Sequence, residues 1–208
     1  MVLVAQVLDA SVVLRPYVPR LLTQWLAEAP GTSVRELEGS VVFVDISGFT
    51  SMSERLASRG RVGAEEVTDV LGAVFSRLLG IAYGNGGGLI KFGGDALLLL
   101  FTGTDHPGKA ARAAVGMRRT LRDIGKIDTS AGKVGLRMSV GIHTGRFDFF
   151  LVGDSHKELI VTGPAASRTV TMESTASAGE ILVSPETAAA LEPRTLGQPK
   201  GEGILLKR

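Results

Sequence analysis

A short apolar run, Ser40–Ile46, is the feature that most constrains how the chain folds. The run is rich in the β-branched residues Val and Ile, and it lies between Gly39 and Gly48. This composition is typical of a strand that is buried on both faces of a sheet. We therefore predict a central strand, with Asp45 at its C-terminal end, that is flanked by other strands and covered by helices.

The chain that follows predicts a helix and then a β-hairpin. Within 65–82, apolar residues recur at the spacing of one helical face, and a glycine-rich stretch ends that helix. Two apolar runs, 89–92 and 96–101, then flank the tripeptide Gly93-Gly94-Asp95. Glycines between two apolar runs favour a tight turn, so we expect Asp95 at the tip of a hairpin.

The remaining segments predict a second helix and more strands. The second helix is expected from Pro107 to about Ile124, and residues 136–142 alternate as a strand does. Strand, helix, hairpin, helix, strand is the order of a ferredoxin-like βαββαβ palm, so the expected fold class is α/β (α+β) with a mostly antiparallel sheet. Further strands are expected at 147–152, 159–162 and 181–183, and a last helix at 185–191.

The chain is expected to form one domain with two attachments. Its 208 residues, 44% of them hydrophobic, are enough for a single core. We predict an N-terminal arm, 1–38, that contains a helical pattern around Trp25, and a single α/β domain, 39–192. The tail, 193–208, is rich in glycine and proline and resembles a linker.

Charge and cysteine content exclude several function classes. A net charge of +2 without runs of like charge does not indicate a nucleic-acid groove.

No stretch reaches membrane-spanning length, the apolar start lacks the basic region of a signal peptide, and a cytoplasmic location is expected. The chain has no cysteine, so any metal has to be held by oxygen or histidine. His106, His143 and His156 lack the spacing of a zinc site.

The two aspartates at strand ends are the strongest candidates for chemistry. Asp45 and Asp95 are distant in the chain, but the predicted palm brings them to neighbouring strand ends. Adjacent carboxylates repel each other unless a cation lies between them, and Mg²⁺ takes its ligands from one or two carboxylates together with substrate phosphates. The alternative is that Asp45 caps a helix and that Asp95 only forms a hairpin turn.

The residues around both aspartates form a specific pattern. Segment 43–50 reads Phe-Val-Asp-Ile-Ser-Gly-Phe-Thr, and segment 91–97 reads Lys-Phe-Gly-Gly-Asp-Ala-Leu. Together with weaker matches in 140–145 and 179–184, they resemble the metal motifs of the class III adenylyl and guanylyl cyclase family over about residues 38–191. Diguanylate cyclases also carry Gly-Gly-Asp, but an acidic residue follows it there, whereas Ala96 follows it here.

The resemblance implies that 39–192 is a nucleotidyl cyclase catalytic domain that converts ATP to 3′,5′-cyclic AMP and pyrophosphate. It implies two Mg²⁺ (or Mn²⁺) ions per working site, and a site formed between two cyclase domains packed head to tail. The residues it assigns are Asp45, Asp95 and the Ile46 carbonyl as metal ligands, Gly48, Phe49 and Thr50 as the phosphate-facing turn, and Lys91 as the lysine that reads adenine.

Three positions depart from the family pattern. Ile160 stands where an Asp or Thr assists the lysine, and Ser167 and Thr171 replace the family's Asn and Arg. The pattern resembles the first of two cyclase domains in soluble, mammalian-type adenylyl cyclases, and it implies that a homodimer of this chain is weak or inactive. The alternative is an inactive regulatory domain that binds an anion, such as bicarbonate, or a nucleotide at the Lys91 pocket.

Overall fold

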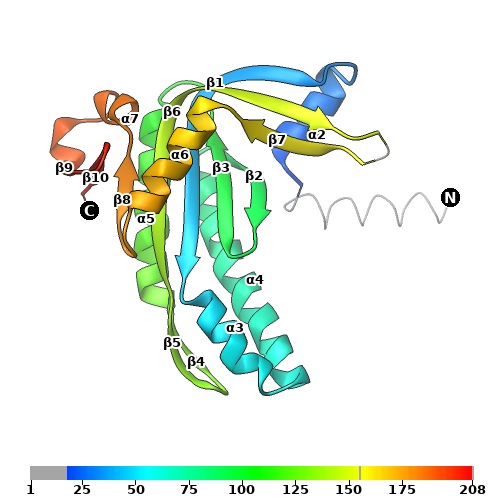
Figure 1. Ribbon diagram of the computed structural model, residues 1–208, viewed down its shortest axis with the longest axis vertical. Coiled ribbons are helices and arrows are strands. Elements are labelled where there is room, and N and C mark those ends of the chain that lie inside the picture. Colours follow the sequence, from blue (N-terminus) through cyan, green and yellow to red (C-terminus); the bar gives the residue numbers. More distant parts are fainter. Residues whose placement is uncertain (1–17, 155, 208) are drawn as a thin grey trace.

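The computed structural model describes residues 18–154 and 156–207 as a large sheet with helices on both faces (Figure 1). The strands of this sheet are β1 (Val34–Ser47), β2 (Gly87–Gly93), β3 (Ala96–Phe101), β6 (Arg137–Val152), β7 (Glu158–Thr162), β8 (Ile181–Val183), β9 (Leu196–Lys200) and β10 (Gly203–Leu206). A separate hairpin consists of β4 (Lys126–Thr129) and β5 (Gly132–Gly135). The helices are α2 (Arg20–Glu28), α3 (Phe49–Ala57), α4 (Arg61–Gly84), α5 (His106–Ile124), α6 (Pro164–Thr175), α7 (Pro185–Ala189) and the 3₁₀ turn η2 (Pro193–Thr195).

The strand order confirms the predicted fold class. The sheet runs β2-β3-β1-β6-β8-β10-β9, and β7 pairs with the second half of β6. Its first four strands have the ferredoxin-like order, and only the pair β6 and β8 is parallel. The predicted central strand, hairpin and long helices are all present, and β1 lies between β3 and β6 as a strand buried on both faces should.

Helices α4 and α5 cover one face of the sheet, and α6 lies across the other (Figure 1). The main core lies under α4 and α5, because alternate residues of β6, namely Met138, Val140 and Ile142, point toward these helices. On the opposite face, a Cβ at Gly141 would lie 2.2 Å from the backbone nitrogen of Glu173 in α6. Glycine at this position therefore allows α6 to lie directly on β6 beside β1.

A second, smaller core involves part of the expected N-terminal arm. The Trp25 side chain of α2 is fully buried in a cluster that includes Phe147, Phe149 and Leu159. Its indole Nε1 donates a hydrogen bond to Thr32 Oγ1 at 2.8 Å. The predicted helix is therefore confirmed, although β1 begins at Val34, before the expected end of the arm at residue 38; residues 1–17 of that arm lie outside the described residues.

The prediction that residues 193–208 form a linker is wrong. Residues 196–206 form strands β9 and β10, which extend the sheet beyond β8, and Leu206 is buried in the main core. The glycines that resemble a linker have a packing role, since a Cβ at Gly203 would lie 2.7 Å from Met172 Sδ. Pro199 is tolerated because β9 is an edge strand.

The prediction that no stretch reaches membrane-spanning length is wrong for α4, the one described helix that is long and apolar enough to cross a membrane. Its length and composition alone do not separate a spanning helix from a core helix. In this fold Val74, Leu78, Leu79 and Ala82 of α4 lie in the main core.

Candidate functional site

Asp45 and Asp95 lie at adjacent strand ends, as the sequence predicts. Asp45 is opposite Ala96 of β3 in the sheet register, and Asp95 is the residue that precedes Ala96 in the β2–β3 turn. The backbone nitrogen of Ile46 donates a hydrogen bond to the Asp95 carbonyl oxygen at 3.3 Å. Ile46 buries its side chain in the main core, so only its backbone can take part in the site.

The two carboxyl groups interact electrostatically. Partial burial raises the pKa of the Asp45 carboxyl above its ordinary value, and the negative charge of Asp95 raises it further. The repulsion between these groups is what a bound divalent cation would relieve. Among residues 18–154 and 156–207 there is no cluster of three or more His, Asp or Glu side chains with the arrangement of a metal site. A metal held here would thus depend on the Asp45 and Asp95 carboxylates and on further oxygen ligands from the backbone or the substrate.

The turn after Asp45 leads directly into helix α3. Gly48 precedes the helix with a φ of 94°, and no side chain caps the first turn of α3. The first turn also contains no acidic residue. Its backbone N–H groups are therefore suited to bind an anion, because they are uncapped and lie at the positive end of the helix dipole. Phe49 packs partly against the main core, and Thr50 is exposed.

We expect Gly48→Ala to destabilise the fold by about 1–3 kcal/mol, since the left-handed backbone strains any residue with a side chain. A Cβ at this position would also lie 2.6 Å from the Gly135 carbonyl oxygen. Urea unfolding measures the change. Gly72→Ala is the matched control: it lies in helix α4 with no atom near the new methyl group, and it should stabilise the chain by up to about 1 kcal/mol. Equal effects of both substitutions would contradict this account.

Lys91 contacts a residue that the sequence analysis did not single out. Its ammonium group forms an ion pair and hydrogen bond with the Glu158 carboxylate of β7, and both side chains are about half exposed. The hydrogen bond from Lys91 lowers the pKa of the Glu158 carboxyl. Glu158 thus supplies a carboxylate to Lys91 although Ile160, at the expected position, has none. No local sequence signal indicates this pair, which joins β2 to β7.

Helix α6 contains the two positions that depart from the family pattern. Ser167 and Thr171 are exposed, and the Thr171 hydroxyl donates to the Ser167 carbonyl oxygen at 3.1 Å. The sequence analysis missed Glu173, two residues further along this helix. Its carboxylate accepts a hydrogen bond from Ser139 at 2.7 Å, its burial raises its pKa, and the nearby charge of Asp45 also raises it.

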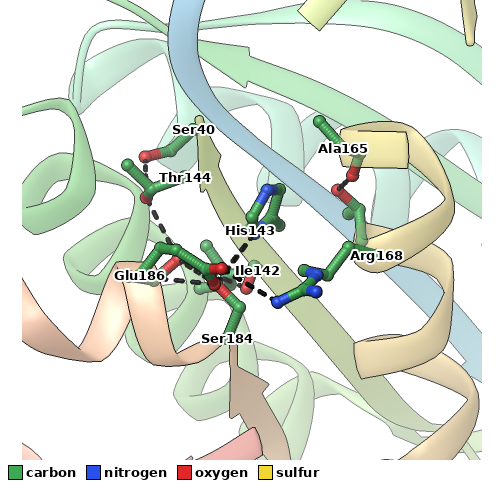
Figure 2. A network of polar contacts seen from close by, with 10 residues as sticks. Ser40, Ile142, His143, Thr144, Ala165, Arg168, Ser184 and Glu186 are labelled. Carbon is green, nitrogen blue, oxygen red and sulfur yellow. Dashed lines mark hydrogen bonds and ion pairs between the residues drawn. The ribbon is translucent and has the colours of Figure 1, made fainter. Parts of the chain in front are cut away.

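A polar network connects α6 and α7 to β6 (Figure 2). His143 is 6% exposed, and its Nδ1 lies 2.8 Å from Ser184 Oγ and 3.6 Å from the Glu186 carboxylate. Glu186 also accepts a hydrogen bond from Arg168 at 2.8 Å. Arg168 is therefore oriented toward α7 and does not replace the guanidinium that is missing at Thr171.

The network continues through hydroxyl groups to a second histidine. The Thr187 hydroxyl of α7 donates a hydrogen bond to the Thr144 hydroxyl at 3.0 Å. The Thr144 hydroxyl is in turn hydrogen-bonded to the Ser40 hydroxyl of β1 at 2.7 Å (Figure 2). Ser40 in turn lies 2.9 Å from His106 Nδ1 at the start of α5. Desolvation lowers the pKa of both His106 and His143. His106 and His143 are thus the two ends of a hydrogen-bonded network that joins β1, β6, α5 and α7.

We expect the chain to lose stability as the pH falls below about 6.5, the ordinary pKa of histidine. Burial lowers the pKa of His143 in the folded state, so the unfolded chain binds more protons in this range and the free energy of unfolding falls with pH. At pH 5.5 the loss from this one residue is at most about 1.4 kcal/mol relative to pH 8. Urea unfolding of the wild-type chain and of His143→Gln at both pH values measures it. An unchanged pH dependence in the variant would contradict the assignment.

Comparisons of sequence identify the family. Residues 34–204 match the family described as the adenylate and guanylate cyclase catalytic domain. Adenylate cyclase type 10 of Homo sapiens is 30% identical over 153 residues, which are 71% of this chain and 9% of that protein. The membrane guanylyl cyclase of Dictyostelium discoideum is 30% identical over 181 residues, which are 84% of this chain and 12% of that protein. The chain thus spans about a tenth of the length of these relatives.

Solved structures agree with the fold. The guanylyl cyclase Cya2 has a TM-score of 0.69 and 27% identity, with 84% of this chain and 93% of that chain covered. The adenylyl cyclase CyaB from P. aeruginosa has a TM-score of 0.66 at 23% identity, with 85% and 97% covered, and this likeness concerns the fold alone. Cyclases of both base specificities are therefore among the similar proteins. Because the family match covers residues 34–204, which is most of the chain, the chain belongs to the adenylate and guanylate cyclase catalytic domain family.

Proposed function

We propose that this chain supplies the metal-binding half of an adenylyl cyclase site, in which ATP is converted to 3′,5′-cyclic AMP and pyrophosphate. The observation that carries the proposal is the meeting of Asp45 and Asp95 beside the uncapped first turn of α3. Carboxylates placed next to free backbone N–H groups suit a metal–triphosphate substrate, because the metal needs oxygen ligands and the phosphates need hydrogen-bond donors.

The residues present fit a divalent metal. Asp45 and Asp95 offer hard oxygen ligands. Burial is the larger cause of the raised pKa of Asp45, and the charge of Asp95 raises it further, which is a repulsion that a cation would relieve. With the Ile46 carbonyl they would hold Mg²⁺ or Mn²⁺, and two ions per working site are part of the proposal. When bound, such ions lower the pKa of the ribose 3′-hydroxyl and stabilise the leaving pyrophosphate.

The residues of the turn bind and orient the substrate in this proposal. The backbone N–H groups of Phe49 and Thr50 would donate to the phosphate oxygens, while Gly48 keeps the turn close to β5. In the reaction the 3′-oxygen bonds to the α-phosphorus, the bond from that phosphorus to the bridging oxygen of pyrophosphate breaks, and the 3′-proton is released.

The proposed site needs a second cyclase domain. Ser167 and Thr171 provide neither an amide nor a guanidinium group on α6. We infer that this chain pairs head to tail with a domain that provides them, and that an isolated homodimer is weak or inactive. Adenine is the proposed base because the chain is similar to adenylate cyclase type 10. In this pairing Lys91, with the Glu158 carboxylate beside it, would line the second, degenerate pocket of the pair. A cytoplasmic location is likewise a proposal.

The test is to mix the purified chain with a cyclase domain that carries the family's Asn and Arg, and to measure cyclic AMP with Mg²⁺ or Mn²⁺. Activity should appear only in the mixture, and EDTA should abolish it. Replacing ATP by GTP tests the base specificity. A mixture that forms no cyclic nucleotide from either substrate, although the two domains associate, would end the proposal.

A second candidate is a regulatory domain that binds an anion, such as bicarbonate, or a nucleotide near Lys91. The absence of the Asn and Arg groups from α6 favours it. In this case we expect bicarbonate to raise the unfolding temperature of the chain. The shift should survive loss of both aspartates but disappear in Lys91→Ala. A shift that requires Asp45 and Asp95 would favour the metal site instead.

A further inference from the structure

A cavity of about 520 Å³ lies between α5, the start of β6 and the loop before β8. Leu121, Leu136 and Met138 are buried residues that form its apolar wall. Gly135 and Gly179 also line the cavity, and as glycines they present backbone without a side chain. The volume is in the range of pockets that hold small molecules.

The polar side of this cavity is strongly basic. Arg118, Arg119 and Arg122 of α5 line it together with Lys126, and no carboxylate from the described part of the chain lines it. Arg119 and Lys126 form no ion pair within the described residues. The guanidinium of Arg118 donates to the backbone carbonyl oxygens of Leu206 at 3.4 Å and Lys207 at 3.3 Å, which anchors it to the last strand.

The spacing of these cations is unfavourable in the absence of an anion. Arg119 and Arg122 are three residues apart on α5, so their charges share one helix face and repel each other. The nearest carboxylate to Arg122 among the described ion pairs is that of its neighbour Asp123, at 3.9 Å. Guanidinium groups match the oxygens of a phosphate group in two-point hydrogen bonds. We propose that this cavity is a binding site for a small phosphate-bearing anion.

This cavity is separate from the two aspartates and does not rest on the proposed function. Met138 points into the main core on the α5 face, whereas Asp45 alternates with Val44 and Ile46 and lies on the α6 face. The two sites are nevertheless neighbours, because Gly135, which lines the cavity, lies close to Gly48 of the phosphate-facing turn.

The experiment is calorimetric titration of the chain with sodium tripolyphosphate in EDTA at constant ionic strength. We expect Arg119→Gln and Lys126→Gln each to weaken binding about ten-fold, since each removes a charge-assisted hydrogen bond. Arg77→Gln, which removes an exposed charge from α4, is the matched control and should leave the dissociation constant unchanged. Far-UV circular dichroism checks that each variant is folded.

The outcomes distinguish a specific phosphate site from the general attraction of a basic surface for anions. The proposal would be overturned if tripolyphosphate bound with equal affinity to the wild-type chain and to the double variant Arg119→Gln with Lys126→Gln. It would also be overturned if sulfate bound as tightly as tripolyphosphate at the same ionic strength. ATP distinguishes the source of the phosphate: if it binds more tightly than tripolyphosphate with the same dependence on Arg119, the occupant is a nucleotide, and if not, an inorganic polyphosphate. Binding that persists in Asp45→Ala shows that this site stands even if the proposed cyclase function fails.

Discussion

Asp45→Ala is expected to lower cyclic AMP formation in the mixture with a complementary domain by on the order of 10³-fold. Metal assistance at a phosphoryl centre is worth several kcal/mol, and each 1.36 kcal/mol corresponds to a tenfold change in rate. In the proposed site the Asp45 and Asp95 carboxylates act together, so Asp95→Ala should have a comparable effect, and the double variant should be little worse than either single variant. The measurement is the initial rate of cyclic AMP formation at saturating partner domain.

The stability of the same variant separates a metal ligand from a structural residue. Burial and the charge of Asp95 raise the pKa of Asp45, so its ionised form opposes folding near neutral pH. In EDTA, Asp45→Ala should therefore unfold at the same urea concentration as the wild type or at a higher one. Asp69→Ala, an exposed position on α4, is the matched control for activity. A variant that keeps its rate but loses stability would give Asp45 a structural role only.

Ser167→Asn combined with Thr171→Arg is expected to raise the cyclase activity of the isolated chain by about 10³-fold or more. An arginine that acts on the transition state of phosphoryl transfer is worth about this factor. Both positions are exposed on α6 and one helical turn apart, and the hydrogen bond that the Thr171 side chain donates is a local one to the Ser167 carbonyl oxygen, so the fold should accept the larger side chains. The assay is cyclic AMP formation by the chain alone with Mn²⁺, over a range of protein concentrations.

A shifted arginine gives the matched control for this gain. Val170 is 49% exposed on the same helix, so Ser167→Asn with Val170→Arg adds the same charge about 100° around the helix axis. Only the variant with arginine at position 171 should gain activity, and adding Asp95→Ala should remove the gain. Equal gains from the two arginine positions would show a general charge effect and would refute the specific role of position 171.

The local sequence pattern predicted most of the elements that position the candidate site. The β-branched run before Asp45, the glycine turn before Asp95 and the helical spacing of 65–82 are each properties of residues close together in the chain, and each is present in the structure. The order of these elements was sufficient for the ferredoxin-like sheet. The assignment of metal-binding roles to both aspartates stays a prediction, which the activity of the Asp45 and Asp95 variants tests.

Local pattern failed where contacts join distant parts of the chain. The segment after residue 193 resembles a linker because it is rich in glycine. Position 203, however, has room only for glycine, because Met172 and Leu182 pack against it. Short strands such as β9 and β10 are stable only when they pair with an existing sheet edge, and the sequence does not show which edge that is.

By itself, then, the sequence determined the strands, the helices and the aspartates at two strand ends, because period and turn chemistry are local properties. Only the tertiary structure decided which groups meet. Glu158 reaches Lys91 across 67 residues, and Glu173 reaches Ser139 across 34. The basic cavity likewise needs the face of α5, the start of β6 and the loop before β8 to come together. Charge and hydrogen-bond partners depend on distance in space, which the periodicity of a single chain does not specify.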